Sequence, residues 1–376
     1  MKKLTIPILL LLASAGVAQN LDYPIQTVPF TKVRLTDSFW LPRIKINHTV
    51  TIPASFERCE NTGRIKNFEM AAAKSGKFCT IYPFDDTDIY KTLEGASFSL
   101  SLYPDKKLDA YMDSLIQKVK DAQEPDGYLY TARTIDPGDP HKWAGKERWE
   151  KERELSHELY NSGHLYEAAA AHYQATGKRN LLDIALKNAD LVCSVFGHDK
   201  KHVAPGHEVV EMGLVKLYRI TGKKEYLQTA KYFIEERGHF NGYDISSKDP
   251  WKSGAYWQDH IPVVQQNEAI GHAVRAGYLY AAIADVAALT GDQNLLKAAD
   301  SIWNNLVQKK LYVQGSVGAI GDGERFVISR SVWQFIIISI AFAGGDGPRA
   351  TLYINLFRNH IYPNTVNGFY QFFISG

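Results

Sequence analysis

The sequence ATGKRNLLDIA at residues 175–185 is the strongest indication of the fold, because similar segments follow as ITGKKEYLQTA at residues 220–230 and as LTGDQNLLKAA at residues 289–299. Each copy ends one helix, makes a Thr-Gly turn and starts a second, amphipathic helix. Glycine supplies the left-handed conformation that stops the first helix. Leu and Ala at i, i+3 and i+4 mark the buried face of the second. The repeat therefore predicts helical hairpins.

The spacing of these hairpins selects among helical-repeat architectures. The copies begin 45 and 69 residues apart, which is irregular for an open solenoid. A degenerate fourth copy spans Thr92 to Val119, with Pro104-Asp105 as its turn. The extra length lies in two loops, 125–149 and 241–262, which are rich in Gly, Pro, Asp, His and Trp. We predict an all-α fold, an incomplete (α/α)6 six-hairpin toroid whose long loops build a cleft at one end.

The beginning of the chain differs from this helical region. Lys2 and Lys3 precede an apolar run, and Gly16-Val17-Ala18 follows it, which is typical of a bacterial signal peptide over residues 1–18. The apolar run is shorter than the roughly 20 residues that a membrane span needs. We expect export to the periplasm or the extracellular space. Residues 21–39, with Pro and alternating Val and Thr, predict an extended lead-in to the toroid.

The end of the chain differs as well. From Val327 to Gly376 there is no Lys or Glu and a single Asp, whereas charged residues are dense upstream. We therefore divide the mature chain into an incomplete (α/α) catalytic-type domain, residues 19–326, and an atypical tail, residues 327–376. Our hypothesis for the abrupt change after Phe326 is a frameshift or recombination.

Composition excludes some classes of partner. The formal net charge is +2, which favours neither nucleic acid nor an anionic membrane. Aromatic residues make up 12% of the chain. Their ring faces can stack on sugars, although rings filling a helical core explain any single one equally well. The three cysteines are spaced like neither a disulfide framework nor a zinc motif, so we expect small buried hydrophobes.

Polar residues recur where the first helix of a hairpin is expected to begin. They are His157-Glu158, His207-Glu208, and Glu268 with His272. The helix dipole alone explains acidic residues at helix starts, whereas three histidines at equivalent positions favour a common site. The pairs His157/His164 and His202/His207 lack the i, i+4 spacing of a His-Glu-x-x-His site, so metal binding by histidines alone is not expected.

Three further features carry carboxylates or rings. The loop that contains Asp126-Gly127-Tyr128 also carries His141. These side chains either bind a sugar or pack within the loop. Asp86 and Asp88 either cap a helix or hydrogen-bond sugar hydroxyls. Glu324 lies in the glycine-rich run GAIGDGERF at residues 318–326, which a substrate can approach closely. Glycoside cleavage commonly needs one carboxyl as general acid and a second group as nucleophile or base, whereas composition alone indicates a solvated loop acid.

These motifs together resemble the non-reducing-end β-L-arabinofuranosidase family, glycoside hydrolase family 127 and its close relatives, over residues 23–326. The most specific are TGRIKNF at residues 62–68, PDGYL at 125–129, HELY at 157–160 and GHAVRA at 271–276. The resemblance implies a six-hairpin barrel and a secreted, retaining hydrolase that acts on arabinofuranosides or related plant-glycan sugars.

The resemblance also implies roles for single residues. Glu324 falls on the family's general acid/base. The candidate substrate-binding residues are His141, His207, His272, Asp86, Asp88 and Glu158. The family's nucleophile is a cysteine held as thiolate on zinc by further cysteines and a glutamate. This chain has no Cys after Cys193 and no Glu after Glu324, so zinc is expected for the family but no metal ligand is assigned here.

Three readings therefore stay open. The first is a hydrolase chain that is inactive because its Cys/zinc site is missing. If a frameshift caused this, the other two reading frames of the neighbouring DNA should encode a Glu-x-Cys or Cys-Cys stretch. The second is a non-catalytic, carbohydrate-binding helical toroid. The third is a helical-repeat interaction module in which the rings and histidines are core; the sequence does not indicate an oligomeric state.

Overall fold

The computed structural model describes residues 21–240, 242–312, 315–318 and 320–326. The predicted signal peptide and the predicted atypical tail lie outside these residues. Within them, every regular element is a helix, and β pairing is limited to isolated bridges. The prediction of an all-α fold is confirmed.

Four helices form the inner row of the molecule. They are α4 (Asp86–Leu102), α7 (Glu158–Thr176), α9 (Val210–Thr221) and α12 (Ala273–Thr290). Helix α7 packs against α4 on one side and α9 on the other, and α9 packs against α12. In α7, 15 of 19 residues are buried. A helix that is buried nearly all round belongs to the core, so this row is the hydrophobic centre of the fold.

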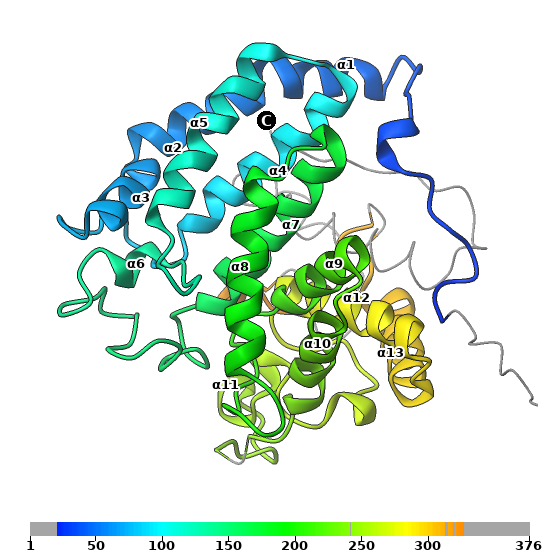
Figure 1. Ribbon diagram of the computed structural model, residues 1–376. Coiled ribbons are helices and arrows are strands. Elements are labelled where there is room, and N and C mark those ends of the chain that lie inside the picture. Colours follow the sequence, from blue (N-terminus) through cyan, green and yellow to red (C-terminus); the bar gives the residue numbers. More distant parts are fainter. Residues whose placement is uncertain (1–20, 241, 313–314, 319, 327–376) are drawn as a thin grey trace, which may run out of the picture.

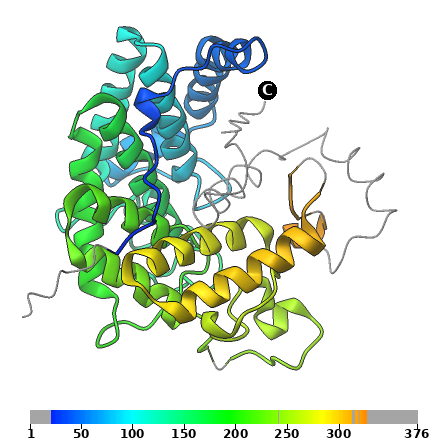
Figure 2. The same cartoon turned by 90° about the vertical axis from the view of Figure 1, so that its right-hand side faces the viewer.

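Four helices form the outer row. They are α5 (Lys106–Ala122), α8 (Asn180–Val195), α10 (Lys224–Glu236) and α13 (Gln293–Asn305). Helix α8 packs on α7, α10 on α9 and α13 on α12, and in α8 only 8 of 16 residues are buried. The hairpins follow one another along a curved double row, from cyan through green to yellow (Figure 1, Figure 2). This is the arrangement predicted for an (α/α) toroid.

The Thr-Gly turns close the hairpins as the repeat predicts. Gly177, Gly222 and Gly291 have φ angles of +75°, +73° and +70°, the left-handed conformation that ends a helix. In each copy the threonine hydroxyl donates to the carbonyl oxygen four residues earlier, at 2.6–2.8 Å. A further Thr-Gly turn with the same two features, Thr62-Gly63, joins α2 (Ile52–Asn61) to α3 (Arg64–Ala73). The repeat had not identified this turn.

The chain before α4 links both ends of the row. Residues 21–39 are extended apart from one 3-10 turn, η1 (Phe30–Lys32), as predicted. The Tyr23 hydroxyl donates to Asp285 of α12 at 3.1 Å, and Asp22 pairs with Arg219 of α9. Helix α1 (Trp40–Ile46) then leads through the π-turn η2 (Asn47–Thr51) into α2, which packs against α4, while α3 packs against α5.

The long loops all join the end of an outer helix to the start of an inner one. Residues 125–149, which include α6 (Thr131–Thr134), lead from α5 towards α7. The loop from α10 to α12 carries the short elements α11 (Pro250–Ser253), η3 (Ala255–Trp257) and η4 (Val263–Gln265). After α13 follow η5 (Leu306–Lys310) and η6 (Asp322–Glu324). The inner helices therefore begin under long loops and end at short turns. None of the described helices combines the length and apolar character needed to cross a membrane.

Candidate active site

Three histidines from different hairpins meet at the starts of the inner helices. His157 is the N-cap residue of α7, His272 is the N-cap residue of α12, and His207 lies just before α9. The ring centroids of His157 and His207 are 5.4 Å apart, and those of His207 and His272 are 5.6 Å apart. The structure thus brings together residues that are 115 positions apart. Glu268, which the sequence analysis grouped with His272, instead pairs with Lys310, with Oε1 and Nζ 2.7 Å apart.

Helix α7 adds two more rings beside this histidine row. Tyr160 and His164 follow His157 at i+3 and i+7, so all three lie on one face of the helix. The Tyr160 ring centroid is 4.3 Å from that of His207 and 4.5 Å from that of His164. Lys91 of α4 donates to the Tyr160 hydroxyl at 2.7 Å. Sequence reasoning had not assigned Tyr160 to the site, although its helical spacing from His157 was a usable signal.

His272 orients the carboxylate of Glu324. The Nδ1 atom of His272 accepts from the backbone N–H groups of Val274 and Arg275 at 3.2 and 3.3 Å, which caps α12. A neutral imidazole that accepts at Nδ1 carries its proton on Nε2. That Nε2 lies 3.0 Å from Oε2 of Glu324. The helix cap therefore fixes the tautomer that donates to the carboxylate.

The loop around Glu324 is fastened to the start of α12. Arg325 forms isolated antiparallel bridges with His272 and Ile320, and the Phe326 N–H donates to the Gly271 carbonyl at 2.9 Å. Glu324 has a φ angle of +50°, unusual for a residue with a side chain. Its side chain is 66% exposed, whereas that of His272 is 9% exposed. The Glu324 carboxylate is thus held by His272 and at the same time exposed to solvent.

An aromatic pair lies under this loop. The rings of Trp251 and Tyr256 stack with centroids 3.7 Å apart, and Tyr256 also contacts His272 edge-on. A Cβ atom at Gly323 would lie 2.9 Å from the Tyr256 ring and 3.1 Å from the Trp251 ring. With a φ angle of +69°, position 323 therefore needs glycine. Sequence reasoning missed this pair, because only loop packing brings it to Glu324.

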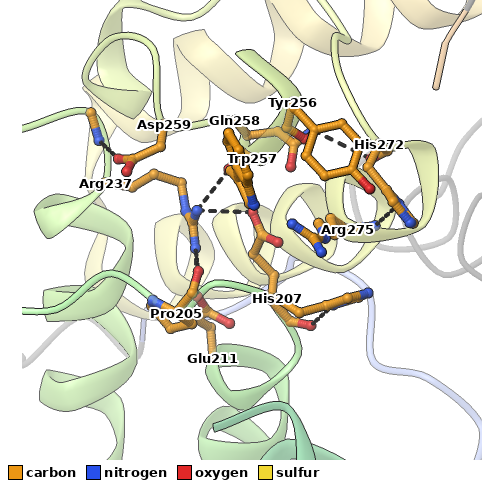
Figure 3. Close-up of polar contacts among 12 residues, drawn as sticks. Pro205, His207, Glu211, Arg237, Tyr256, Trp257, Gln258, Asp259, His272 and Arg275 are labelled. Carbon is orange, nitrogen blue, oxygen red and sulfur yellow. Dashed lines mark hydrogen bonds and ion pairs between the residues drawn. The ribbon is translucent and has the colours of Figure 1, made fainter. Parts of the chain in front are cut away.

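A buried arginine joins the loops that carry His207 and Tyr256. Arg237 is 1% exposed and donates to the carbonyl oxygens of Pro205 and Trp257 at 2.7 and 2.8 Å (Figure 3). Its guanidinium also pairs with Glu208 at 3.1 Å. Removing one member of such a buried pair is costly, so Arg237 fixes the two loops relative to each other.

A second buried arginine, Arg275, lies in the first turn of α12. Its guanidinium carbon is 4.9 Å from the centre of the Tyr256 ring, and its Nε and Nη1 atoms have no hydrogen-bond partner (Figure 3). Burial lowers the pKa of His157 and His207 well below the ordinary value, and the charge of Arg275 lowers both pKa values further. Burial also lowers the pKa of His272, against an opposing hydrogen bond to Glu324. The three histidines therefore act as neutral hydrogen-bonding groups at neutral pH.

His141 is linked to the histidine row through aromatic rings. Its half-buried ring packs against Phe78 and Trp143, with centroids 5.4 and 5.6 Å away. Successive ring contacts of 4.8–5.8 Å then run from Trp143 through Tyr82 and Phe84 to His157. An aromatic surface thus connects the loop 125–149 with the starts of the inner helices.

The predicted substrate-binding carboxylates have protein partners. Asp86 accepts from the hydroxyl and the N–H of Thr131 at 2.5 and 2.9 Å. Glu158 accepts from the Tyr128 hydroxyl and the Trp149 N–H at 2.5 and 2.8 Å. Both carboxyls are buried, which raises the pKa of each to about 7. They hold the loop 125–149 against α4 and α7; whether they also meet a sugar stays a prediction.

Asp88, the third carboxylate of this predicted set, is less buried. Its Oδ2 atom pairs with Nε of Arg64 at 2.6 Å. Arg64 also reaches Asp85, with the two side chains 3.4 Å apart. Asp88 therefore ties the start of α4 to the start of α3.

The residues present do not fit a zinc-bound thiolate. Burial raises the pKa of Cys59 and of Cys193 to about 11 each, which favours the thiol. Cys193 lies against the Glu225 carbonyl in the outer row. Cys79, which we expected to be buried, is exposed, and its backbone N–H donates to Oδ1 of Asn67. None of the three contacts the histidine row or Glu324 in the described part of the chain.

Comparisons with known proteins agree with this geometry. The model of the β-L-arabinofuranosidase GH127 catalytic domain matches residues 32–332. A non-reducing end β-L-arabinofuranosidase of Bifidobacterium longum subsp. longum is 38% identical over 275 residues, which cover 70% of this chain and 41% of that protein.

Two solved structures are similar over most of the described fold. A GH127 β-arabinofuranosidase superposes with a TM-score of 0.79 and 48% identity, covering 91% of this chain and 52% of that one. A GH127 β-L-arabinofuranosidase from Geobacillus stearothermophilus T6 gives a TM-score of 0.71 and 38% identity, covering 79% and 48%. The chain thus spans about half the length of these relatives or less. With a family match across most of its length, this chain belongs to the GH127 β-L-arabinofuranosidase family of glycoside hydrolases.

Proposed function

We propose that this chain binds a β-L-arabinofuranoside or a related plant-glycan sugar at the starts of its inner helices, with Glu324 as the general acid/base. His141, His207 and His272 line the sugar in this proposal. The observation that carries it is the His272–Glu324 pair, in which a helix-capping imidazole presents its Nε2–H to an exposed carboxylate at 3.0 Å.

The proposed chemistry follows from the neutral state of the histidines. A general acid transfers its proton to the leaving oxygen as the glycosidic bond breaks. The Nε2–H of His272 orients the Glu324 carboxyl, and the 66% exposure of the Glu324 side chain gives a leaving oxygen access to its proton. Since burial keeps the imidazoles uncharged, they hydrogen-bond sugar hydroxyls without competing for the acid role. The exposed ring faces of Tyr82 and Trp251 suit stacking against a sugar.

We further propose that this chain binds sugar without completing a retaining hydrolysis. A retaining mechanism needs a nucleophile on the face opposite the acid/base. The family's zinc-bound thiolate is not matched by Cys59, Cys79 or Cys193, so no step is assigned to a metal. This observation favours the second candidate function, a carbohydrate-binding toroid, over a complete hydrolase.

Binding and turnover are tested on the same protein. Calorimetry with methyl β-L-arabinofuranoside should show saturable binding, and the 4-nitrophenyl glycoside should release no nitrophenol. His207→Ala should weaken binding by at least about tenfold, since a site hydrogen bond is lost. His198→Ala, at an exposed imidazole that pairs with Glu235, is the matched control and should leave the affinity unchanged. Equal affinities for the two variants, or no binding at all, would contradict the proposal.

The role of Glu324 is tested with azide as an external nucleophile. Azide attacks the anomeric carbon while Glu324 protonates the leaving oxygen, which yields an arabinosyl azide and the free alcohol. With a poor leaving group, Glu324→Gln should slow this reaction by about 10²–10⁴-fold. Asp322→Asn, a carboxylate in the same loop that pairs with Arg325, should react like the wild type. The same azide rate in all three proteins, or none in any, would refute the assignment.

We also propose that residues 1–18 direct export and are removed. N-terminal sequencing of protein recovered from a bacterial periplasm or culture medium should begin at Gln19. An intact Met1 on a chain that stays in the cytosol would contradict this expectation.

A further inference from the structure

A second polar cluster lies at the opposite end of α7 from the histidine row. It consists of Asp109 and Asp113, one turn apart on α5, and His172 in the last turns of α7. One ligand atom from each of the three lies within 4.8 Å of the other two. His172 is fully buried, and neither of its ring nitrogens has a hydrogen-bond partner. Leaving a buried imidazole unpaired is unfavourable, so its presence beside two carboxylates calls for a functional explanation.

The helical repeat shows that histidine is not needed at this position for packing. His172 precedes the threonine of the Thr-Gly turn by four residues. The equivalent residues in the next two copies are Leu217 and Val286, and both are fully buried. An aliphatic side chain therefore fills this place elsewhere in the same scaffold. The copy that carries histidine is also the one that faces two aspartates.

A positive charge already lies between the two aspartates. Nζ of Lys178 is 2.6 Å from Asp109 and 2.7 Å from Asp113, and the Asn180 amide donates to Asp113 at 2.8 Å. Two carboxylates and one ammonium leave a formal net charge of −1 beside the buried imidazole of His172. The matched lysine of the next copy, Lys223, instead pairs with the single Asp190 at 2.5 Å.

We propose that Asp109, Asp113 and His172 form a binding site for a divalent transition-metal ion such as Zn²⁺, which the Lys178 ammonium occupies when the metal is absent. One imidazole nitrogen and two carboxylate oxygens suit zinc and its neighbours, whereas calcium and magnesium prefer oxygen ligands alone. Zinc bonds of about 2.0–2.2 Å require a small rotation of the carboxylates towards His172. The bound ion would fasten α5 to α7, and so one hairpin to the next, far from Glu324.

The test is zinc titration of the metal-free full chain by calorimetry, with the visible spectrum of Co²⁺ as a second probe. One ion per chain should bind at this site. His172→Leu, which installs the residue found at position 217, should fold normally and weaken zinc binding by at least about tenfold. Asp113→Asn should do the same from a partly exposed position. Lys178→Met should strengthen binding about tenfold, because the ion no longer displaces an ammonium.

Matched variants at the next hairpin serve as controls. Lys223→Met and Asp190→Asn change the equivalent lysine and its partner without a histidine, and should leave zinc affinity unchanged. The exposed histidines 198 and 202 lie beside Glu235 and Glu236, so both are replaced by Ala in every protein to remove weak surface binding.

Two results would overturn the proposal: no stoichiometric zinc in the wild type, or the same affinity after His172→Leu and Asp113→Asn. Zinc should also raise the melting temperature of the wild type but not of His172→Leu. These readouts are independent of sugar binding and of azide turnover, so failure of either proposal leaves the other standing.

Discussion

The two ends of the inner helices are built on different principles. At the C-terminal ends of α7, α9 and α12, the same Thr-Gly turn recurs with nearly the same backbone angles. At the N-terminal ends no two helices start alike: α7 begins at a left-handed histidine, α9 after Val209 with a φ angle of +146°, and α12 at an extended histidine. The repeated end closes the scaffold, and the irregular end carries the candidate site.

Backbone strain follows the same division. Six residues other than glycine have positive φ angles in the described chain. Five of them lie in the loops or helix starts around the histidine row: Trp149, His157, Val209, Gln258 and Glu324. Strained backbone persists only where surrounding contacts hold it, and it clusters at functional sites. The scaffold end is therefore set by local sequence signals, whereas the site end depends on contacts between loops.

Loss of the buried arginine that joins these loops should destabilise the protein most. Arg237→Ala should lower the free energy of unfolding by about 3–5 kcal/mol, because it leaves Glu208 buried without its partner. Urea denaturation followed by circular dichroism measures this. Arg179→Ala, in an exposed pair with Asp183, should change stability by no more than about 0.5 kcal/mol. A loss below about 1 kcal/mol for Arg237→Ala would mean that the loops do not depend on this arginine.

Two glycines with the same backbone conformation differ in how crowded their surroundings are. Gly271, at the site end, and Gly222, at the scaffold end, have φ angles of +76° and +73°. A Cβ atom at 271 would lie 2.1 Å from the Ala255 carbonyl oxygen, whereas at 222 nothing lies within 4 Å. Gly222→Ala should cost about 1 kcal/mol from the left-handed backbone alone, and Gly271→Ala about 3 kcal/mol with overpacking added. Thermal unfolding of both variants measures these losses of stability. Equal losses would show that crowding around the glycine does not distinguish the two ends of the inner helices.

The smallest expected effect is the pH dependence of stability at the site end. Glu152 accepts from the N–H groups of Glu158 and Leu159 at the start of α7, and its burial raises its pKa from 4.5 to about 8. The folded state thus holds this proton more tightly than the unfolded state does. Its contribution to stability is fully present below pH 4.5 and is lost as the pH rises through about 8.

Glu152→Gln removes this dependence while keeping an oxygen acceptor for the two N–H groups. The free energy of unfolding of this variant, relative to that of the wild type, should rise by at least about 1 kcal/mol from pH 5 to pH 8.5. At the scaffold end, the hydrogen bond from Lys231 lowers the pKa of Asp292. Asp292→Asn should therefore leave the pH dependence of the free energy of unfolding above pH 5 unchanged. Parallel pH profiles of wild type and Glu152→Gln would show that Glu152 does not titrate with folding.

Much of the scaffold could be predicted because its signals are local. A threonine, a glycine and an apolar stripe within one or two helical turns located three hairpins, and Pro104-Asp105 located a fourth, where Asp105 caps α5. The additional turn at Thr62-Gly63 has the same signal and could have been found in the same way. Three histidines at helix starts were also recognisable, since a helix start is itself a local feature.

The surroundings of the site could not be predicted in this way. A carboxylate at a helix start has the same sequence signal whether it faces solvent, as Asp88 partly does, or a loop threonine, as Asp86 does. The Trp251–Tyr256 pair reaches Glu324 only because the loop after α10 folds back over the start of α12. Distant partners such as Arg153 and Asp259, 106 residues apart, fix that loop.

The amino-acid order was sufficient to predict the helical hairpins, their Thr-Gly turns and the family to which the chain belongs. Each depends on residues within a few turns of one another or on motifs that can be read in order. The folded arrangement was needed to establish which histidine nitrogen faces Glu324 and which carboxylates are already bound by protein groups. It also revealed that His172 lies beside Asp109 and Asp113. Those outcomes depend on the packing of side chains from different hairpins, where burial and hydrogen bonding set the charge and the available atoms of each group.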